Sequence, residues 1–212
     1  TGMLPMQAWL TTAHPVAPAP ASALLSGVIT KAGVLGIIRV TFYLYGDSFI
    51  RGTWVQETFL ILTLLTVFTG SMLAYKEKLL KKRLAYSTVS QISYALFGLF
   101  LLTGKSVEGA LLQVVFHALA KDTLFLAVGA MLYMTGAARV DQIPGMGRKM
   151  PVTMWCFTIA SLSLIGIPPM SGFVSKWYLA MGALDSGMGG IATAGVVVLL
   201  LSALLTAGYL LP

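Results

Sequence analysis

The residues of this chain that could do chemistry lie inside long apolar stretches, where hydrocarbon penalises charge. His117, Lys121 and Asp122 fall within VVFHALAKDTLFLAVGAML, residues 114–132, and Lys31 falls within SGVITKAGVLG. A lysine at the centre of a membrane helix costs on the order of 3 kcal/mol on insertion scales. Lys31 therefore either is neutralised or paired with an acid for structural reasons, or it carries protons.

Gln113, His117 and Lys121 are spaced four residues apart, so they share one face of a helix. A histidine exchanges protons near neutral pH, and a buried lysine releases its proton more readily than a free one. This face therefore predicts a polar track for proton transfer. Asp122 projects about 100° away from it, and we expect it to pair with a cation such as Lys31 or simply to offset charge.

Lys176 follows GIPPMSG, residues 166–172, in a stretch that otherwise resembles one membrane crossing. If a second half-helix begins there, the positive end of its dipole disfavours the charge of Lys176 and eases loss of its proton. The neighbouring Trp177 and Tyr178 also fit another role, in which Lys176 is an anchor that reaches toward the membrane interface.

Two segments, HPVAPAPAS and GIPPMSG, interrupt the helical pattern with prolines, which remove backbone donors. Irregular backbone at membrane depth is tolerated only inside protein or beside a wet cavity, and broken helices mark ion pathways in transporters. A simple proline kink is the alternative for GIPPMSG. The predicted break residues are Pro15, Pro18, Pro20, Gly166, Pro168, Pro169 and Gly172.

A further polar face lies in RLAYSTVSQISYALFG. Ser87, Ser90, Gln91 and Tyr94 share one side of the predicted helix. Such groups hold water or form hydrogen bonds between helices, and interhelical contact is the favoured interpretation.

The composition identifies an integral membrane protein. Of the 212 residues, 57% are hydrophobic and 10% are charged, whereas soluble domains carry about 25% charged residues. The net charge of +7 lies in short segments between apolar runs, so no nucleic-acid partner is expected. The single cysteine, Cys156, builds neither a disulfide framework nor a metal set and is expected to be a small buried hydrophobe.

Apolar runs of about 20 residues predict an all-α transmembrane bundle with about six spans and a half-helix at residues 1–10. We expect one transmembrane domain over residues 1–212. Both ends appear cut, which predicts a fragment of a larger subunit. The expected spans are 22–45, 54–75, 84–103, 107–134, 152–181 with a break at 166–172, and 190–211.

The basic segments 76–83 and 135–151 are separated by two crossings, so both are predicted on one side of the membrane. The positive-inside rule makes that side cytoplasmic, and the inner membrane of a prokaryote is expected. Walker, dinucleotide-binding, haem, iron–sulfur and zinc patterns are absent from the sequence. Proton or cation movement, not cofactor chemistry, is what these residues suit.

Four ordered motifs give the chain a strong resemblance to a known family. They are LPMQAWLTTAHPVAPAPASALLSGVITKAGVLGIIR, LLKKRLAYSTVSQISY, GALLQVVFHALAKDTLFLAVGAMLY and GIPPMSGFVSKWYL. Together they resemble the antiporter-like subunits shared by respiratory complex I, energy-converting membrane hydrogenases and Mrp-type sodium/proton antiporters. The resemblance implies discontinuous helices and the second half of a fourteen-helix subunit.

The resemblance also implies roles. Lys31, His117, Lys121 and Lys176 match a mid-membrane row of proton carriers, and His14 matches an AHP stretch beside a helix break. Two departures stand out. Thr11 and Thr12 replace a common proline and acid, and Asp122 replaces a small or apolar residue. The lysine and glutamate of the family's first half-channel would lie before residue 1.

Three hypotheses follow. The leading one is a proton-translocating, possibly Na⁺-translocating, subunit of a redox-driven complex, with no redox cofactor of its own. Its partners would be other membrane subunits, lipid and a peripheral arm with iron–sulfur clusters and a flavin or NiFe centre. The second is an Mrp-type secondary antiporter, which the tryptophan in GFVSKW favours. The third is a scaffold that does not pump.

Overall fold

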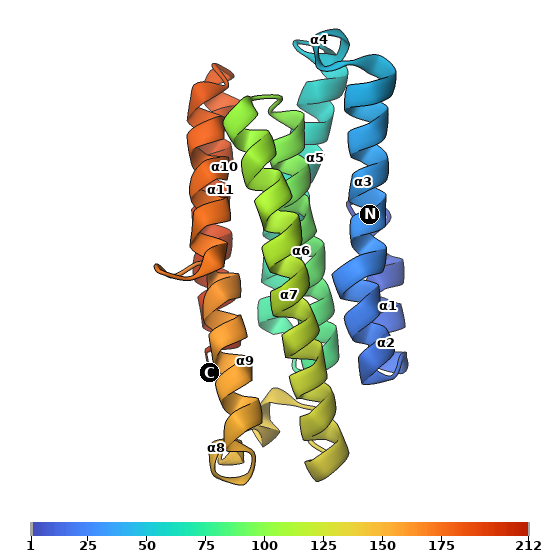
Figure 1. Cartoon of the computed structure of the whole chain (residues 1–212), viewed down its shortest axis with the longest axis vertical. Helices are drawn as coiled ribbons and strands as arrows, with labels where there is room; N and C mark the ends of the chain where they lie inside the picture. The colour runs from blue at the N-terminus through green and yellow to red at the C-terminus, as the bar shows by residue number, and fades with distance from the viewer. Residues whose placement is uncertain (1, 212) are drawn as a thin grey trace.

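The protein is an elongated bundle of helices that run up and down, as a computed structural model describes it for residues 2–211 (Figure 1). Within that range the chain forms helices and turns and no β-strand. The prediction of an all-α fold is therefore confirmed.

The first crossing is a chain of short helical elements with different pitch. α1 ends before the extended residue Ala17, and Pro18 then precedes α2. Pro15 was predicted as a break residue, but it lies inside the last turn of α1, and the break falls at residues 17–18. The elements are α1 (Ala8–Val16), α2 (Ala19–Leu24), the π-helical turn η1 (Leu25–Ile29), α3 (Thr30–Ile38) and η2 (Arg39–Tyr45).

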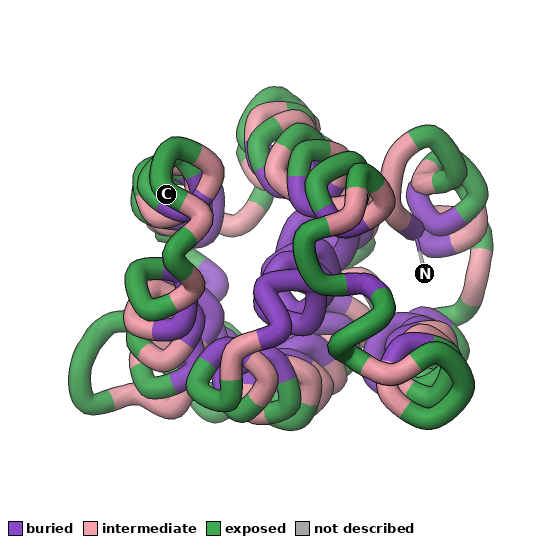
Figure 2. The backbone as a smooth tube through the Cα atoms, turned by 90° about the horizontal axis from the view of Figure 1, so that it is seen from above, coloured by how far each residue is buried: buried purple, intermediate pink, exposed green. Residues whose placement is uncertain are grey.

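The helices α5 (Trp54–Lys76), α6 (Leu80–Phe100) and α7 (Gly104–Thr135) form the centre of the bundle, with α6 packed against both others. α6 is buried along most of its length, and buried residues gather in the middle of the view in Figure 2. Four segments of residues 2–211 are long and apolar enough to span a membrane, and the hydroxyl-rich α6 is not among them. Its polar side chains are tolerated because protein surrounds them.

The ends of α7 follow from local side-chain and backbone chemistry. The Thr103 hydroxyl accepts from the backbone N–H of Ser106, and the Ser106 hydroxyl accepts from the N–H of Thr103. This capping box satisfies donors that an isolated helix start leaves open. Gly136, with a φ of 69°, ends the helix because glycine enters the left-handed region without steric cost.

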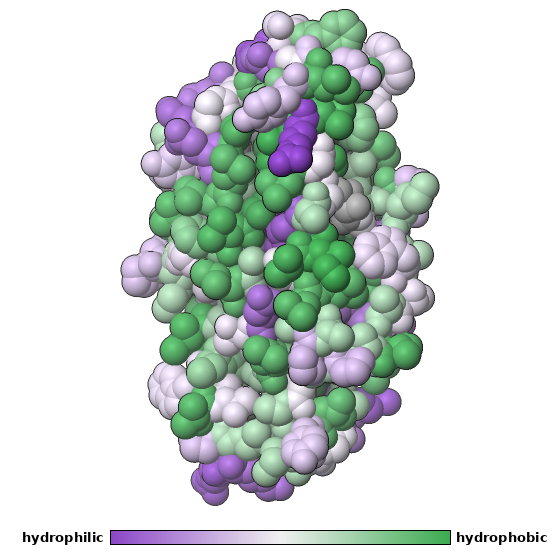
Figure 3. Space-filling view, turned by 45° about the vertical axis from the view of Figure 1, so that its right-hand side comes forward, coloured by the Kyte–Doolittle hydropathy of each residue, from purple (hydrophilic) through white to green (hydrophobic). Residues whose placement is uncertain are grey.

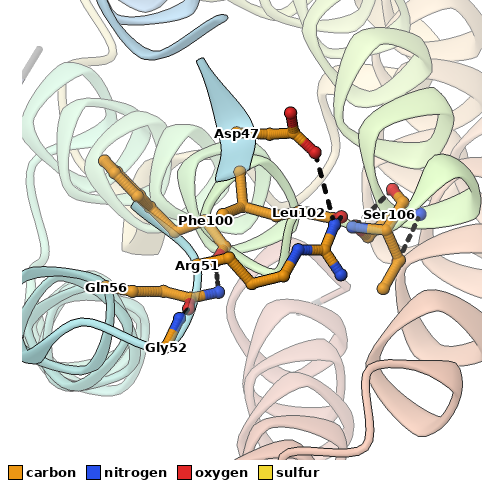
Figure 4. A network of polar contacts seen from close by, with 8 residues as sticks. Asp47, Arg51, Gly52, Gln56, Phe100, Leu102 and Ser106 are labelled. Atoms are coloured by element: carbon orange, nitrogen blue, oxygen red, sulfur yellow. Dashed lines mark hydrogen bonds and ion pairs between the residues drawn. The ribbon is translucent and has the colours of Figure 1, made fainter. Parts of the chain in front are cut away.

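A short turn fixes the membrane-end connection before α5. After α4 (Asp47–Ile50), Arg51 Nη2 donates to the Leu102 carbonyl over 2.5 Å. Gln56 Nε2 donates to the Phe100 carbonyl, and its Oε1 accepts from Gly52, each over 2.8 Å (Figure 4). These contacts join the turn to the last residues of α6.

The final crossing before the C-terminal helix is broken. α9 (Pro151–Ile165) ends at Gly166, which has a φ of 87°, and α10 (Ser171–Asp185) begins five residues later. Pro168 and Pro169 lie between the two helices, and Gly172 passes so close to the Ser163 carbonyl that a Cβ would overlap it. α11 (Gly189–Leu210) completes the bundle.

The two basic segments lie at the same end of the molecule. Leu79 and Arg139 form an isolated antiparallel bridge, in which the Leu80 N–H donates to Ala138 over 3.0 Å and the Val140 N–H donates to Lys78 over 3.0 Å. The short helices η3 (Val140–Gln142) and α8 (Met146–Lys149) follow in the second segment.

The flank of the molecule is apolar and its two ends are polar, as Figure 3 shows for one side. Large exposed side chains there include Trp155 at 68% and Leu204 at 71% exposure. Cys156 is also exposed on α9, so the expectation of a buried cysteine was wrong. An apolar side chain that faces lipid has no need of a protein cover, and the chain is an integral membrane protein.

Candidate proton-relay site

Three helices bring the predicted relay residues into the bundle. α3 supplies Lys31, α7 supplies His117 and Lys121, and α10 supplies Lys176. Lys121 is fully enclosed, and Lys31 and His117 are 6% and 3% exposed. Buried ammonium groups need acceptors, and each of these lysines finds a backbone carbonyl.

Lys31 lies just after the π-helical turn η1. Its Nζ donates to the carbonyl of Ser26, five residues earlier, and the Thr30 hydroxyl donates to the same carbonyl over 2.9 Å. π-helical turns are rare and occur frequently at functional sites, where they disturb the regular hydrogen-bond pattern. The altered pitch therefore helps to provide the acceptor for Lys31.

Lys121 is held by the neighbouring helix α6. Its Nζ donates to the Leu84 carbonyl over 2.9 Å. The Thr88 hydroxyl donates to the same carbonyl over 3.0 Å. This ammonium group is therefore solvated by a main-chain dipole inside the protein.

The predicted polar face of α7 exists, but its members bind different partners. Gln113 Nε2 donates to Gln91 Oε1 of α6 over 2.7 Å, and the Ser175 hydroxyl of α10 donates to Gln113 Oε1 over 2.6 Å. Gln113 thus links three helices. Ser175 was missed by sequence reasoning, and its place directly before Lys176 was the available signal.

His117 faces a small cavity. Its Nε2 has no hydrogen-bond partner within residues 2–211. A cavity of about 10 Å³ lies beside the ring and is lined also by Gln113, Ser163 and Leu164. That volume is close to the minimum for one water molecule, and the lining offers polar partners for it.

Lys176 reaches back across the helix break. Its Nζ donates to the carbonyls of Leu164 and Ile165, over 2.8 and 2.7 Å, and lies 5.4 Å from the centre of the Tyr94 ring. These carbonyls end α9, where the helix dipole places partial negative charge. The sequence argument considered only the start of α10, whereas the observed contacts favour the ammonium form and direct it inward.

Asp122 packs closely against α2–η1. Its carboxylate lies over the Cα of Gly27, where a Cβ would overlap both oxygens. Lys31 follows Gly27 by one turn, yet the two side chains form no ion pair within residues 2–211. Asp122 Oδ1 also has no hydrogen-bond partner in that part of the chain. The predicted partner is therefore a neighbour, without direct contact.

The remaining predicted residues are placed around this group. His14 is fully buried and stacks on Phe125 with ring centres 4.7 Å apart, and neither ring nitrogen has a hydrogen-bond partner among the described residues. Ser87 shares a hydrogen bond with Tyr209 of α11 over 2.7 Å, and Ser90 shares one with Ser71 of α5 over 2.8 Å. These two serines join helices, as the favoured interpretation stated.

Comparisons with known proteins identify the class to which this arrangement belongs. The family described as NADH:quinone oxidoreductase/Mrp antiporter, TM, matches residues 1–202. The chain belongs to this family of transmembrane antiporter-like proteins.

Individual relatives come from several kinds of membrane assembly. The chain is 38% identical over 210 residues to NADH-quinone oxidoreductase subunit N of Desulforudis audaxviator, covering 98% of this chain and 40% of that protein. It is 34% identical over 188 residues to hydrogenase-4 component B of Escherichia coli, covering 84% of this chain and 28% of that protein.

Solved structures show the same fold. A chain of the Mrp complex from Dietzia sp. has a TM-score of 0.86 at 31% identity, covering 98% of this chain and 38% of that one. A chain of respiratory complex I from Thermus thermophilus has a TM-score of 0.87 at 26% identity, covering 99% and 43%. The chain spans about two fifths of the length of the first relatives it matches.

Proposed function

We propose that this chain is part of a proton-translocating membrane subunit in which Lys31, His117, Lys121 and Lys176 carry the proton. The observation that carries the proposal is Lys121, a fully buried ammonium whose acceptor is the Leu84 carbonyl. Such a group inside a membrane protein is costly and marks an ion pathway more often than a purely structural site.

Proton movement would depend on mutual repulsion between the lysines. Two unit charges about 8 Å apart interact by about 2 kcal/mol at an effective dielectric constant of 20. A proton that binds Lys31 would therefore favour proton release from Lys121, and release there would prepare Lys121 for the next proton. The cavity beside His117 would hold the water that continues the route toward Lys176.

Redox energy released in other subunits would drive this cycle. The proposed partners are further membrane subunits and a peripheral redox arm. Iron–sulfur clusters and a flavin or NiFe centre would lie in that arm, and lipid would cover the apolar flank. We place the subunit in an inner membrane, with the loops 76–83 and 135–151 in the cytoplasm because they carry the basic residues.

Lysine substitutions test the transport proposal. Lys121→Met and Lys176→Met, in vesicles with the intact membrane complex, are expected to abolish proton uptake per assembled complex. Lys105→Met is the control, because Lys105 is exposed and pairs with Asp185 at the end of α7. Normal uptake in both test variants would favour the non-pumping scaffold.

An Mrp-type secondary antiporter is the second candidate, supported by the similarity to the Dietzia Mrp complex. Purification of the native complex in mild detergent separates the two. Co-purifying subunits with iron–sulfur absorbance support the redox-driven complex. A set of colourless membrane subunits that exchanges Na⁺ for protons without electron donors supports the antiporter.

A further inference from the structure

A hydrogen bond between two hydroxyls joins the acceptors of two relay lysines. Ser26 Oγ and Thr88 Oγ1 lie 2.8 Å apart. The Ser26 carbonyl accepts from Lys31 Nζ, while Thr88 donates to the Leu84 carbonyl, which also accepts from Lys121 Nζ. The two ammonium groups are thus connected across three helical elements by hydrogen bonds alone.

Both hydroxyl groups are enclosed by protein. Ser26 and Thr88 are each 0% exposed, so water does not replace a lost partner at the surface. Each residue also has a second contact that fixes it. Ser26 belongs to the π-helical turn η1, and Thr88 is held to its own helix by the Leu84 carbonyl over 3.0 Å. Hydrogen-bonded networks of this kind rigidify a core when all members are satisfied.

We infer that Ser26 and Thr88 are positioning residues that fix the separation between the ammonium groups of Lys31 and Lys121. The inference rests on the proposed proton route. Coulomb coupling between two charges varies with their distance, so the bridge sets how strongly protonation of one lysine favours proton release from the other.

Several titratable groups surround this bridge and contribute to any pH dependence measured there. They come from α1, α3, α6, α7 and α10. The groups are His14, Lys31, Lys81, His117, Lys121, Asp122 and Lys176. A change in the bridge alters the arrangement of these charges while leaving every one of them in place.

Matched variants of the intact membrane complex test the inference. Thr88→Val removes the hydroxyl at nearly constant volume, Thr88→Ser keeps it, and Ser26→Ala removes the partner. Ser93→Ala is the control, because Ser93 is a buried serine of α6 that donates to Val89 of the same helix over 3.0 Å. Lys31→Met and Lys121→Met report on the proton route itself.

The readouts are proton uptake per assembled complex and its pH profile. Thr88→Val is expected to lower uptake on the order of tenfold and to shift the pH of half-maximal uptake. Thr88→Ser restores both, and the Ser26→Ala/Thr88→Val pair is no worse than the poorer single variant. A purely structural bond would lower assembly and leave the pH profile of the assembled complexes unchanged.

Two results overturn the inference in distinguishable ways. If Lys121→Met is inactive while Thr88→Val and Ser26→Ala match Ser93→Ala in rate and pH profile, the bridge does not position the lysines and the proton route stands. If Lys31→Met and Lys121→Met both transport normally, the proposed function fails and the inference with it. Ser26→Ala decides the question should Thr88→Val not assemble.

Discussion

The carboxylate of Asp122 occupies the space that a side chain at residue 27 would need, because Gly27 brings its bare Cα against both oxygens. α7 and the π-helical turn η1 therefore approach each other one turn before Lys31. The same region contains Ser26, so charge and hydrogen bonding meet at a single contact between two helices.

We predict that Gly27→Ala destabilises the protein by about 1–3 kcal/mol, because the added methyl group overlaps the Asp122 carboxylate. The double variant Gly27→Ala/Asp122→Ala should recover most of the loss. Thermal unfolding of the purified complex measures both. Gly36→Ala is the control, since no neighbouring atom lies within 4 Å of a Cβ at that position of α3. Equal effects at Gly27 and Gly36 would contradict the close contact.

Asp122→Asn should lower proton transport while preserving the fold, because it removes a charge near Lys31 and Lys121 at constant size. A loss of about 1.4 kcal/mol of charge interaction corresponds to a tenfold change in a protonation equilibrium. Uptake per assembled complex and its pH profile are the measurements. Wild-type values for both would mean that Asp122 serves packing alone.

Tyr94→Phe should reduce stability by about 1 kcal/mol and leave transport intact. The buried hydroxyl donates to the Leu199 carbonyl over 2.9 Å, which Phe cannot do. The ring beside Lys176 Nζ remains. Tyr133→Phe on the exposed surface of α7 is the control for both quantities. Loss of transport at unchanged stability would instead place the hydroxyl on the proton route.

The loop before α6 should lose stability in acid. Partial burial raises the pKa of Glu77, but the Lys82 ammonium 3.0 Å away and the N–H groups of Lys78 and Leu79 outweigh it and hold the pKa below its usual value. The ionised carboxylate thus stabilises the fold above the pKa of the unfolded chain, about 4.3. This contribution disappears as pH falls through the lower, folded pKa.

Melting curves between neutral pH and about pH 3 measure this effect. Glu77→Gln should melt below wild type at neutral pH and converge with it in acid. Asp47→Asn is the control, because Asp47 forms an exposed pair with Arg51 at the opposite end of the chain's first loop. A constant difference between Glu77→Gln and wild type across the pH range would contradict the assignment.

Sequence periodicity was sufficient for features that lie within one element. The four-residue spacing of Gln113, His117 and Lys121 does produce a single buried face on α7. The prolines after Gly166 do separate α9 from α10, because the missing donors and the left-handed glycine are local properties. The role of each residue in transport remains a prediction.

Features that depend on the docking of separate helices were not visible in the sequence. Thr88 was missed because its importance comes from Ser26, 62 residues earlier in the chain. The acceptors of Lys176 were missed because they are main-chain carbonyls of α9, and any sequence that ends a helix there supplies them. Pro15 was wrongly assigned to a break, because a proline in the last turn of α1 disturbs few hydrogen bonds.

The bridge between Leu79 and Arg139 has a consequence for the order of assembly. Its two partners flank the α6–α7 hairpin, so they cannot meet until both helices have been threaded through the bilayer in opposite directions. Insertion must therefore work against the mutual repulsion of two cationic segments until the backbone pairing closes. Once closed, the pairing makes withdrawal of either helix conditional on unfastening the other.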